Sequence, residues 1–331
     1  MNSEELNRRE AIKRGAILGG GMLALKGLSP LAWAAPRSNE MPMSFFGKTG
    51  VRVSKIGVGT ASLSKPECSE EEAMRVIDQA IDEGINYFDT APRYDQGEAE
   101  RRTGKGLKGK RDKVFLVSKT HDQSYEGTWK LLEQSLKHLQ TDYLDMVHLH
   151  NIGHEERWED LDFAFSEKGA MGALREAKQK GMVRFIGATG HLYPSRFGRV
   201  VESDEIDALM VAVNFVNQHT YNFEDKVWLP AASKNKGLVS MKVFGGRVGR
   251  TASHRFDPAD YENALRYTLS LKGLNTAVVG MSSRAHLNQL LETFRRVDAL
   301  SEEELIAVAR RGRELIEENP RLQAMHGGST A

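Results

Sequence analysis

The sequence predicts an α/β fold, a closed (β/α)₈ barrel of the TIM-barrel class. Short apolar runs of strand length alternate with charged segments that carry apolar residues at helical spacing, and this alternation occurs eight times. Strands buried on both faces of a parallel sheet are typically apolar throughout, and eight β–α units are the number that closes a barrel. The 331-residue length accommodates such a barrel, which typically takes about 250 residues, as one domain.

The apolar runs predict the strands. The turn after the first strand distinguishes between two possible architectures, an open sheet and a closed barrel. An open doubly wound sheet would favour Gly-x-Gly-x-x-Gly after its first strand. Here the turn reads Gly57-Val58-Gly59-Thr60-Ala61-Ser62, without the third glycine, which favours the barrel. The predicted strands span residues 53–60, 85–91, 114–120, 143–150, 183–190, 206–215, 238–244 and 275–281.

The helices are predicted from their caps and their apolar stripes. Ser69 and Glu72 have the spacing of a capping box at the start of the first helix, and Gly84 ends it. A further amphipathic helix over residues 301–318 follows the last unit and is expected to pack outside the barrel. The helices between the strands include residues 69–84, 124–139, 170–180, 224–235, 258–271 and 283–297.

Charge and cysteine content exclude several classes of protein. The chain has 46 Lys and Arg against 45 Asp and Glu, a net charge of +1, so nothing indicates nucleic acid as a partner. Cys68 is the only cysteine, which excludes a disulfide within the chain and a cysteine-based metal cage. We predict no metal site.

Residues 1–34 differ from the rest of the chain and are predicted to form an export signal. They contain Arg8 and Arg9, a weakly apolar run at 16–25 and the small-residue pattern Ala32-Trp33-Ala34. An apolar run of about ten residues is too short to cross a bilayer core of roughly 30 Å as a helix. A basic start, a short apolar run and a small-residue site are instead typical of a cleaved signal peptide.

The paired arginines favour the twin-arginine route, which makes that translocation machinery an expected partner and the bacterial periplasm the expected location. The mature barrel would then be residues 35–331, with no stable membrane anchor once the signal is cleaved. The alternative is an ordinary N-terminal helix that packs on the barrel.

Four polar side chains of different chemistry lie at or just after three successive predicted strands. Asp89 lies near the end of the second strand and Tyr94 follows it, while Lys119 lies at the end of the third and His150 at the end of the fourth. Active residues of (β/α)₈ barrels sit at the carboxyl ends of strands, so all four are expected at one mouth. His148 lies two residues earlier; we expect it on the helix side of the strand and do not choose it.

These residue types suit the reduction of a carbonyl group. Tyr94 can protonate the developing alkoxide, and a nearby Lys119 ammonium would favour the phenolate and so make the phenol a better acid. Asp89 would hold that ammonium by ion pairing, and His150 can donate a hydrogen bond to the carbonyl oxygen. The hydride itself must come from a cofactor.

Five motifs together resemble the aldo-keto reductase family. The resemblance runs from about residue 45 to residue 297 and implies a barrel with an N-terminal β-hairpin and the tetrad Asp89, Tyr94, Lys119 and His150. The motifs are Phe45-x-Gly47-Lys48-Thr49-Gly50-Val51-x-Val53-Ser54, Asn86-Tyr87-Phe88-Asp89-Thr90-Ala91-x-x-Tyr94-x-x-Gly97-x-x-Glu100, Phe115-Leu116-Val117-Ser118-Lys119-Thr120, Tyr143-Leu144-Asp145-x-x-x-x-His150 and Arg184-Phe185-Ile186-Gly187-Ala188-Thr189-Gly190.

The resemblance also implies a nicotinamide cofactor, NADP(H) in preference to NAD(H). Backbone amides at the start of the last barrel helix would suit its phosphate. The residues implied to bind it are Gly59, Thr60, Asp89, Thr189, Asn214, Lys242, Phe244, Gly245, Ser282, Ser283, Arg284 and Gln289.

Several of these positions depart from the family pattern and leave NAD(H) open. Thr189-Gly190 stands where the family usually has Ser-Asn, and Asn214 stands where Gln is common. Ser282 or Ser283 occupies the position where Lys is frequent, so Arg284 is the only nearby cation. Gln289-Leu290 replaces the usual Glu-Asn.

The function expected from these observations is reduction of an aldehyde, ketone or sugar-like carbonyl, or the reverse reaction on the alcohol. Two alternatives are a sensor or scaffold barrel that binds the nucleotide with negligible turnover, and an isomerase or aldolase barrel with a Schiff base at Lys119. The intact tetrad argues against both. Residues after strand ends that could line a substrate pocket are Arg93, His121, Trp158, His191 and Tyr193.

Overall fold

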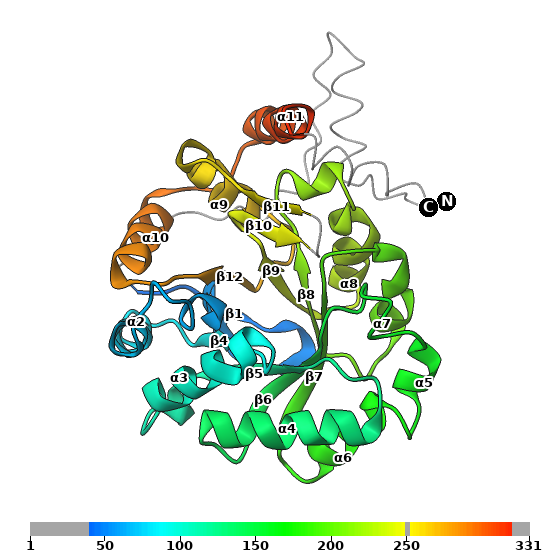
Figure 1. Cartoon of the computed structure of the whole chain (residues 1–331). Coiled ribbons are helices and arrows are strands. Elements are labelled where there is room, and N and C mark those ends of the chain that lie inside the picture. Colours follow the sequence, from blue (N-terminus) through cyan, green and yellow to red (C-terminus); the bar gives the residue numbers. More distant parts are fainter. Residues whose placement is uncertain (1–39, 249–251, 320–331) are drawn as a thin grey trace.

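The computed structural model describes residues 40–248 and 252–319, and its centre is a closed barrel of parallel strands. The strands follow one another around the barrel in the order β12-β3-β4-β5-β6-β7-β8-β9, which confirms the predicted architecture (Figure 1). Their bounds are β3 Ile56–Gly59, β4 Tyr87–Asp89, β5 Phe115–Thr120, β6 Leu144–Leu149, β7 Val183–Gly190, β8 Ala208–Ala212, β9 Gly237–Met241 and β12 Thr276–Gly280.

Helices surround the barrel, and their order along the chain follows the colour gradient in Figure 1. They are α2 Glu70–Asp82, α3 Glu98–Gly106, α4 Tyr125–Leu139, α5 Leu161–Phe165, α6 Ala170–Gln179, α7 Gly198–Glu202, α8 Leu229–Ser233, α9 Tyr261–Leu269, α10 Arg284–Arg296 and the extra helix α11 Glu302–Glu317. Short 3₁₀ turns lie at Gly47–Thr49, Thr60–Ser62, Tyr94–Gly97, Arg111–Lys113, Pro194–Phe197, Asn217–His219 and Pro258–Asp260.

The helix predicted over residues 224–235 is instead a π-helical turn, Glu224–Trp228, followed by the short α8. Pro230 stands at the start of α8 and has no N–H to donate to the preceding turn. The regular helical hydrogen-bond ladder is therefore interrupted at this position.

A β-hairpin closes the amino-terminal end of the barrel, as the resemblance implied. Its strands β1 Met43–Phe45 and β2 Arg52–Ser54 pair antiparallel. Phe46 lies fully buried in the connection, with its ring edge-on to Tyr87 at 5.8 Å and to Phe115 at 5.4 Å between centroids. Because Tyr87 and Phe115 begin β4 and β5, the Phe46 ring fills the amino-terminal end of the barrel interior.

Side chains inside the barrel form their own apolar layer, separate from the layer between strands and helices. Val117 of β5, Met146 of β6 and Met210 of β8 belong to this inner layer with Tyr87 and Phe115. Side chains alternate between the two faces of a strand, so every second residue after Val117 and Met146 also points inward. The inner positions nearest the mouth are therefore those of Lys119, His148 and His150.

The first helix begins as predicted but lacks the full capping box. Ser69 Oγ accepts a hydrogen bond from Glu72 N, which is half of that motif. The Glu72 carboxylate is directed elsewhere and accepts from the backbone N–H of Arg284 at 2.8 Å. The sequence could not show this contact, because residue 284 lies 212 positions further along the chain.

A second hairpin, β10 Gly245–Val248 with β11 Ala252–Arg255, follows β9 and was not predicted. The strand expected over residues 238–244 ends earlier, at Met241, because Lys242 and Gly245 adopt left-handed backbone angles. The predicted signal at residues 1–34 lies outside the described residues. Within the described ranges, no helix has the length and apolarity needed to cross a membrane.

Candidate active site

Asp89 and Lys119 form a buried ion pair at the carboxyl ends of two neighbouring strands. Lys119 Nζ donates to Asp89 Oδ1 at 2.6 Å and to the backbone oxygen of Thr90 at 2.6 Å. The two strands pair in register, with Asp89 of β4 opposite Val117 of β5. The fold therefore delivers both charges to one point in the barrel interior, as the sequence predicted.

Tyr94 lies above this pair, in the 3₁₀ turn that follows β4. The Lys119 ammonium is 4.9 Å from the centroid of the Tyr94 ring. The next three residues, Asp95, Gln96 and Gly97, all have positive φ and turn the chain sharply after the tyrosine. The Asp95 carboxylate is held by Lys65 at 3.0 Å, which steadies this turn.

His150 completes the arrangement from β6. Its ring lies edge-on to the Tyr94 ring, with 6.0 Å between centroids and an interplanar angle of 88°. The fully buried Trp158 donates from Nε1 to the backbone oxygen of His150 at 2.9 Å. His150 Nδ1 is buried and has no hydrogen-bond partner among the described residues.

The protonation states follow from burial and from the Lys119 charge. Burial acts to lower the pKa of Lys119, but the charge of the Asp89 carboxylate and its hydrogen bond oppose burial and the pKa is raised, so Lys119 stays an ammonium. Burial, then Lys119, lowers the pKa of His150 well below its ordinary value, so the imidazole is neutral.

The pKa of Tyr94 differs from the expectation. Lys119 does act to lower it, as predicted, but burial is the larger effect and raises the pKa of the phenol above its ordinary value. Tyr94 is therefore fully protonated at neutral pH and holds the proton that a reduction requires.

His148 also points into the barrel, so the expectation that it faces the helices was wrong. Residues two apart in a strand share a face, and His148 lies between the inward-facing Met146 and His150. In the ladder between β5 and β6, His148 lies opposite Lys119. An added Cβ at Gly187 would lie 2.3 Å from His148 Nδ1, which shows how closely the imidazole fills the space beneath His150.

Known proteins share the sequence pattern and the fold of this chain. Residues 55–263 match the model of the aldo/keto reductase family. The chain belongs to the aldo/keto reductase family. It is 28% identical over 298 residues to L-galactose dehydrogenase of Arabidopsis thaliana, covering 79% of this chain and 90% of that protein.

Two solved aldo/keto reductases share the fold. One, from Bacillus halodurans, superposes with a TM-score of 0.66 at 24% identity and covers 83% of this chain and 96% of its own. The other, from Klebsiella pneumoniae and in complex with NADP and acetate, has a TM-score of 0.61 at 24% identity, covering 81% and 94%.

Around the tetrad, this aldo/keto reductase has buried polar atoms that suit a bound dinucleotide. Thr60 Oγ1, Thr90 Oγ1 and Asn151 Oδ1 are buried without hydrogen-bond partners among the described residues. Thr189 Oγ1 accepts from Asn151 N at 2.9 Å and keeps its own proton to donate. Unpaired buried donors and acceptors are costly, so a polar ligand that satisfies them fits this mouth.

Asn214 and the loop after β9 are joined by a hydrogen bond. Asn214 Oδ1 accepts from the backbone amides of Val216 and Asn217, and its amide donates to the Lys242 oxygen at 2.8 Å. The side chain thus braces two loops of the aldo/keto reductase mouth. Phe244 packs on Tyr261, with 5.0 Å between ring centroids.

The segment expected at the adenosine phosphate forms the first turns of α10. Ser283 caps the helix, and Ser282 Oγ lies 3.2 Å from His286 Nδ1. Arg284 faces the Glu72 carboxylate, with Arg284 Nε 3.6 Å from Glu72 Oε1. Gly59 lies opposite Gly280 in the ladder between β3 and β12, whereas Gln289 is exposed further along α10.

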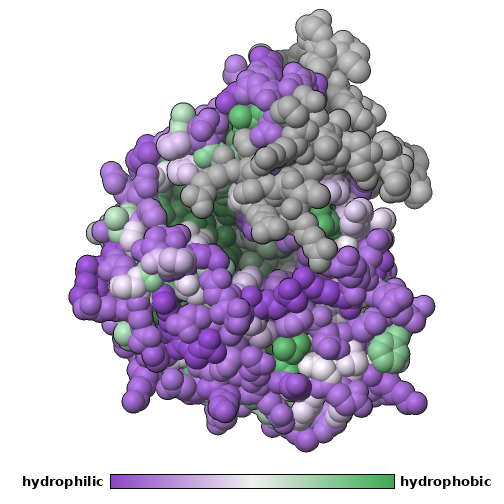
Figure 2. All heavy atoms as spheres, in the orientation of Figure 1, coloured by the Kyte–Doolittle hydropathy of each residue, from purple (hydrophilic) through white to green (hydrophobic). Residues whose placement is uncertain are grey.

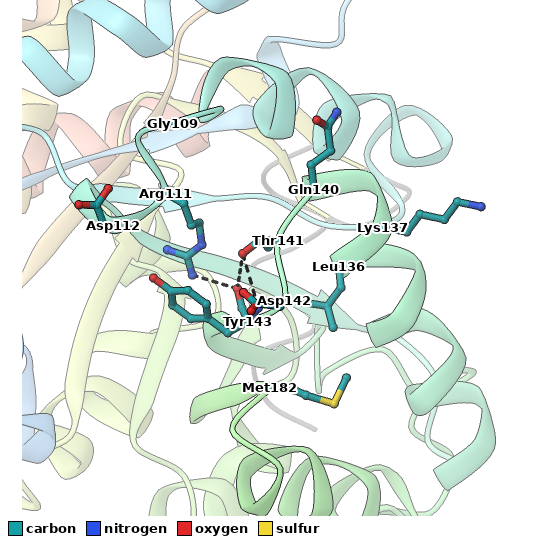
Figure 3. Close-up of a pocket in the computed structure, with 10 residues that line it drawn as sticks. All are labelled: Gly109, Arg111, Asp112, Leu136, Lys137, Gln140, Thr141, Asp142, Tyr143 and Met182. Atoms are coloured by element: carbon teal, nitrogen blue, oxygen red, sulfur yellow. Dashed lines mark hydrogen bonds between the residues drawn. The ribbon is translucent and has the colours of Figure 1, made fainter.

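The mouth appears in Figure 2 as a hollow in which apolar residues lie deep within a hydrophilic surface. A separate hollow of about 980 Å³ lies elsewhere, near the ends of α3 and α4 (Figure 3). There Arg111 stacks over Tyr143 at 3.9 Å from the ring centroid and pairs with Asp145 at 2.8 Å. Because those residues lie at the amino-terminal end of β5 and β6, this hollow is remote from the tetrad.

Proposed function

We propose that this aldo/keto reductase catalyses the NAD(P)H-dependent reduction of an aldehyde, ketone or sugar-like carbonyl, or the reverse oxidation of the alcohol. One observation carries the proposal: Asp89, Tyr94, Lys119 and His150 converge at the ends of three adjacent strands. A phenol, an ammonium held by a carboxylate and a neutral imidazole are the groups that a hydride transfer to a carbonyl needs around the reacting oxygen.

In this proposal each side chain has a separate role. The neutral His150 imidazole donates a hydrogen bond to the carbonyl oxygen and orients it. Tyr94 delivers its proton to that oxygen as negative charge develops there. The Lys119 ammonium stabilises the phenolate that remains, and Asp89 keeps the ammonium in position. When bound, the nicotinamide supplies the hydride.

Thr60, Thr189 and the backbone amides of Ser282 and Ser283 would contact the dinucleotide, with Gly245 allowing close approach of the loop after β9. The complex of the Klebsiella pneumoniae relative with NADP supports NADP(H) as the carrier. NAD(H) stays the alternative because a carboxylate, Glu72, already faces Arg284.

Titration of the purified protein with NADPH and with NADH, followed by nicotinamide fluorescence, tests the proposal. We expect saturable binding of at least one reduced dinucleotide and oxidation of the bound form when an aldehyde is added. Tight binding with no turnover of any carbonyl would favour the sensor or scaffold function. Binding of neither dinucleotide would refute the reductase function.

We also propose that the chain is exported in folded form by the twin-arginine route and acts in the periplasm after loss of residues 1–34. The support is the Arg8–Arg9 pair, the short apolar run and the small-residue site in the sequence. Changing both Arg8 and Arg9 to Lys should leave the protein in the cytoplasm, as judged by fractionation of cells that express it. Undiminished export would contradict this route.

A further inference from the structure

We propose that the carbonyl compound bound at this site carries an anionic group, a carboxylate or a phosphate, which is held beside Arg93 on the β4–β7 side of the mouth. The inference rests on the proposed function and narrows its substrate class. Three observations carry it: the position of Arg93, an arc of imidazoles with free nitrogen atoms, and the balance of charge around them.

Arg93 directly precedes Tyr94 and forms the amino-terminal end of its 3₁₀ turn. The side chain is exposed, and no hydrogen bond or ion pair joins it to any described residue. Most other arginines of the barrel pair with a carboxylate, as Arg102 does with Glu98 at 2.9 Å. A guanidinium left without a partner next to the proposed proton donor is placed to meet an anion brought by the substrate.

Three imidazoles lie at the barrel mouth, each just after one of the strands that follow β4. His121 follows β5, His150 follows β6 and His191 follows β7, and these strands are adjacent in the barrel. His150 N donates to the Thr120 oxygen at 2.7 Å, which places residues 121 and 150 side by side. Nδ1 of each of the three histidines is buried and lacks a partner among the described residues.

The charges around this arc are mostly positive. Burial, then the charges of Arg93 and Arg157, lowers the pKa of His121 to about 4. Burial, then Lys242, lowers the pKa of His191 to about 3. The three imidazoles are therefore neutral at pH 7 and can donate or accept hydrogen bonds, while the fixed charges nearby are cations.

Three acidic residues close to the arc, Asp122, Glu155 and Asp89, have contacts of their own. Asp122 Oδ1 accepts from Ser124 N and Oγ at 2.9 and 2.7 Å, where it braces the start of α4. Glu155 lies in the loop after β6, 67% exposed and 3.8 Å from Arg196. Asp89 is paired with Lys119. None of these three carboxylates forms an ion pair with Arg93.

A carboxylate or phosphate is the chemistry that this arrangement fits. The planar guanidinium of arginine matches both groups with two parallel hydrogen bonds, and the neutral imidazoles can donate to the remaining oxygens. The anionic group would be held away from the reacting carbonyl, so it fixes orientation and takes no part in proton or hydride transfer.

Matched substrate pairs that differ only in charge test the proposal. The carboxylate pair is 4-carboxybenzaldehyde against the neutral 4-formylbenzamide, and the phosphate pair is glyceraldehyde 3-phosphate against glyceraldehyde. We expect kcat/KM for the charged member of at least one pair to exceed that of its neutral partner about tenfold or more, the effect of one hydrogen bond to a charged group. Which pair shows the preference decides between carboxylate and phosphate.

The variants Arg93→Gln and Arg93→Lys locate the preference, and Arg52→Gln is the matched control. Arg52 is exposed on β2 at the opposite end of the barrel, so its change alters the net charge equally. We expect the charged-to-neutral ratio to fall about tenfold in Arg93→Gln, to recover in part in Arg93→Lys, and to stay within about twofold of the parent ratio in Arg52→Gln.

Calorimetric titration with 4-(hydroxymethyl)benzoate and its neutral amide gives a second readout that needs no turnover. Binding of the acid that weakens in Arg93→Gln but not in Arg52→Gln supports the proposal. A charged-to-neutral ratio near one in the parent protein, or a preference unaffected by Arg93→Gln, overturns it while the reductase function stands. If no carbonyl is reduced and neither dinucleotide binds, the proposed function fails and this inference fails with it.

Discussion

Lys119 Nζ lies 2.6 Å from Asp89 Oδ1 in the barrel interior, where each side chain is only 2% exposed. Neither charge could remain there alone, because an isolated buried ion costs several kcal/mol of folding free energy. The pair is therefore both a structural element and the source of the electrostatic field at Tyr94.

Replacing Asp89 by Asn should leave the Lys119 ammonium buried without its counter-ion. We expect the free energy of unfolding to fall by about 3–5 kcal/mol, measured by urea denaturation. Asp78→Asn is the control, because its ion pair with Lys110 is partly exposed and should contribute less than about 1 kcal/mol. Equal losses in the two variants would contradict a special role for the buried pair.

Tyr94→Phe removes the proposed proton donor and keeps the ring. We expect kcat/KM for carbonyl reduction to fall about 10²–10⁴-fold, the usual contribution of a positioned acid, while the Kd for NADPH changes little. Tyr143→Phe, at the far end of the barrel beneath Arg111, serves as the control. Turnover in Tyr94→Phe at the parent rate would remove Tyr94 from the mechanism.

His121 and His191 should make the fold sensitive to acid. Their pKa values are about 4 and about 3 in the folded protein, whereas an unfolded histidine has a pKa of about 6.5. Between these values the unfolded chain binds more protons, so stability is lost as the pH falls from about 6.5 towards 4. Each histidine contributes a slope of up to about 1.4 kcal/mol per pH unit.

Unfolding free energies measured between pH 7 and pH 4 for the parent protein and for His191→Gln check this dependence. Other groups titrate in the same range, so the informative quantity is the difference between the two curves. We expect a shallower loss in the variant, whereas parallel curves would mean that His191 protonates freely in the folded state.

Glu72→Gln should raise the affinity for NADPH relative to NADH. The Glu72 carboxylate faces Arg284, 3.6 Å from Nε, and accepts from the Arg284 N–H at 2.8 Å, where it would repel a 2′-phosphate. Fluorescence titration of both dinucleotides gives the ratio of Kd values, and we expect a shift of about tenfold. Glu83→Gln is the control, since Glu83 makes a similar pair with Arg295 at the other end of α10.

Gly187→Ala should be destabilising because an added Cβ would lie 2.3 Å from His148 Nδ1. We expect a loss of about 1–3 kcal/mol in the free energy of unfolding. In a His148→Ala background the same change should lower the free energy of unfolding much less. Part of the loss should remain, because the added Cβ would also lie 2.8 Å from the Ala208 backbone oxygen. An unchanged cost in that background would show that His148 is not the group displaced.

Much of this fold was accessible from the sequence because the signals are local. Strands buried on both faces must be apolar, so β5, β6 and β7 were predicted to within a residue or two. The tetrad could also be predicted, because parallel strands in a barrel bring their carboxyl ends to one mouth.

Other features depended on contacts between segments far apart in the chain. Glu72 has the spacing of a capping box, but α10 presents a backbone N–H that its carboxylate contacts instead. The sequence also suggested that Lys119 would lower the pKa of Tyr94, yet burial of the phenol outweighs the ammonium. Neither the contact of Glu72 nor the direction of the Tyr94 pKa shift can be derived from the local sequence.

The sequence by itself determined the alternation of strands and helices and the four side chains that meet at the barrel mouth, because periodicity and strand order fix them, whereas the hairpin before the barrel was implied by the family resemblance. Strand alternation alone places His148 on the same inner face as His150. Only the tertiary structure decided that Asn214 braces loops, and that Arg93, beside Tyr94, has no hydrogen-bond or ion-pair partner among the described residues. These depend on which atoms come within hydrogen-bond distance once the barrel closes, and that distance is set by packing.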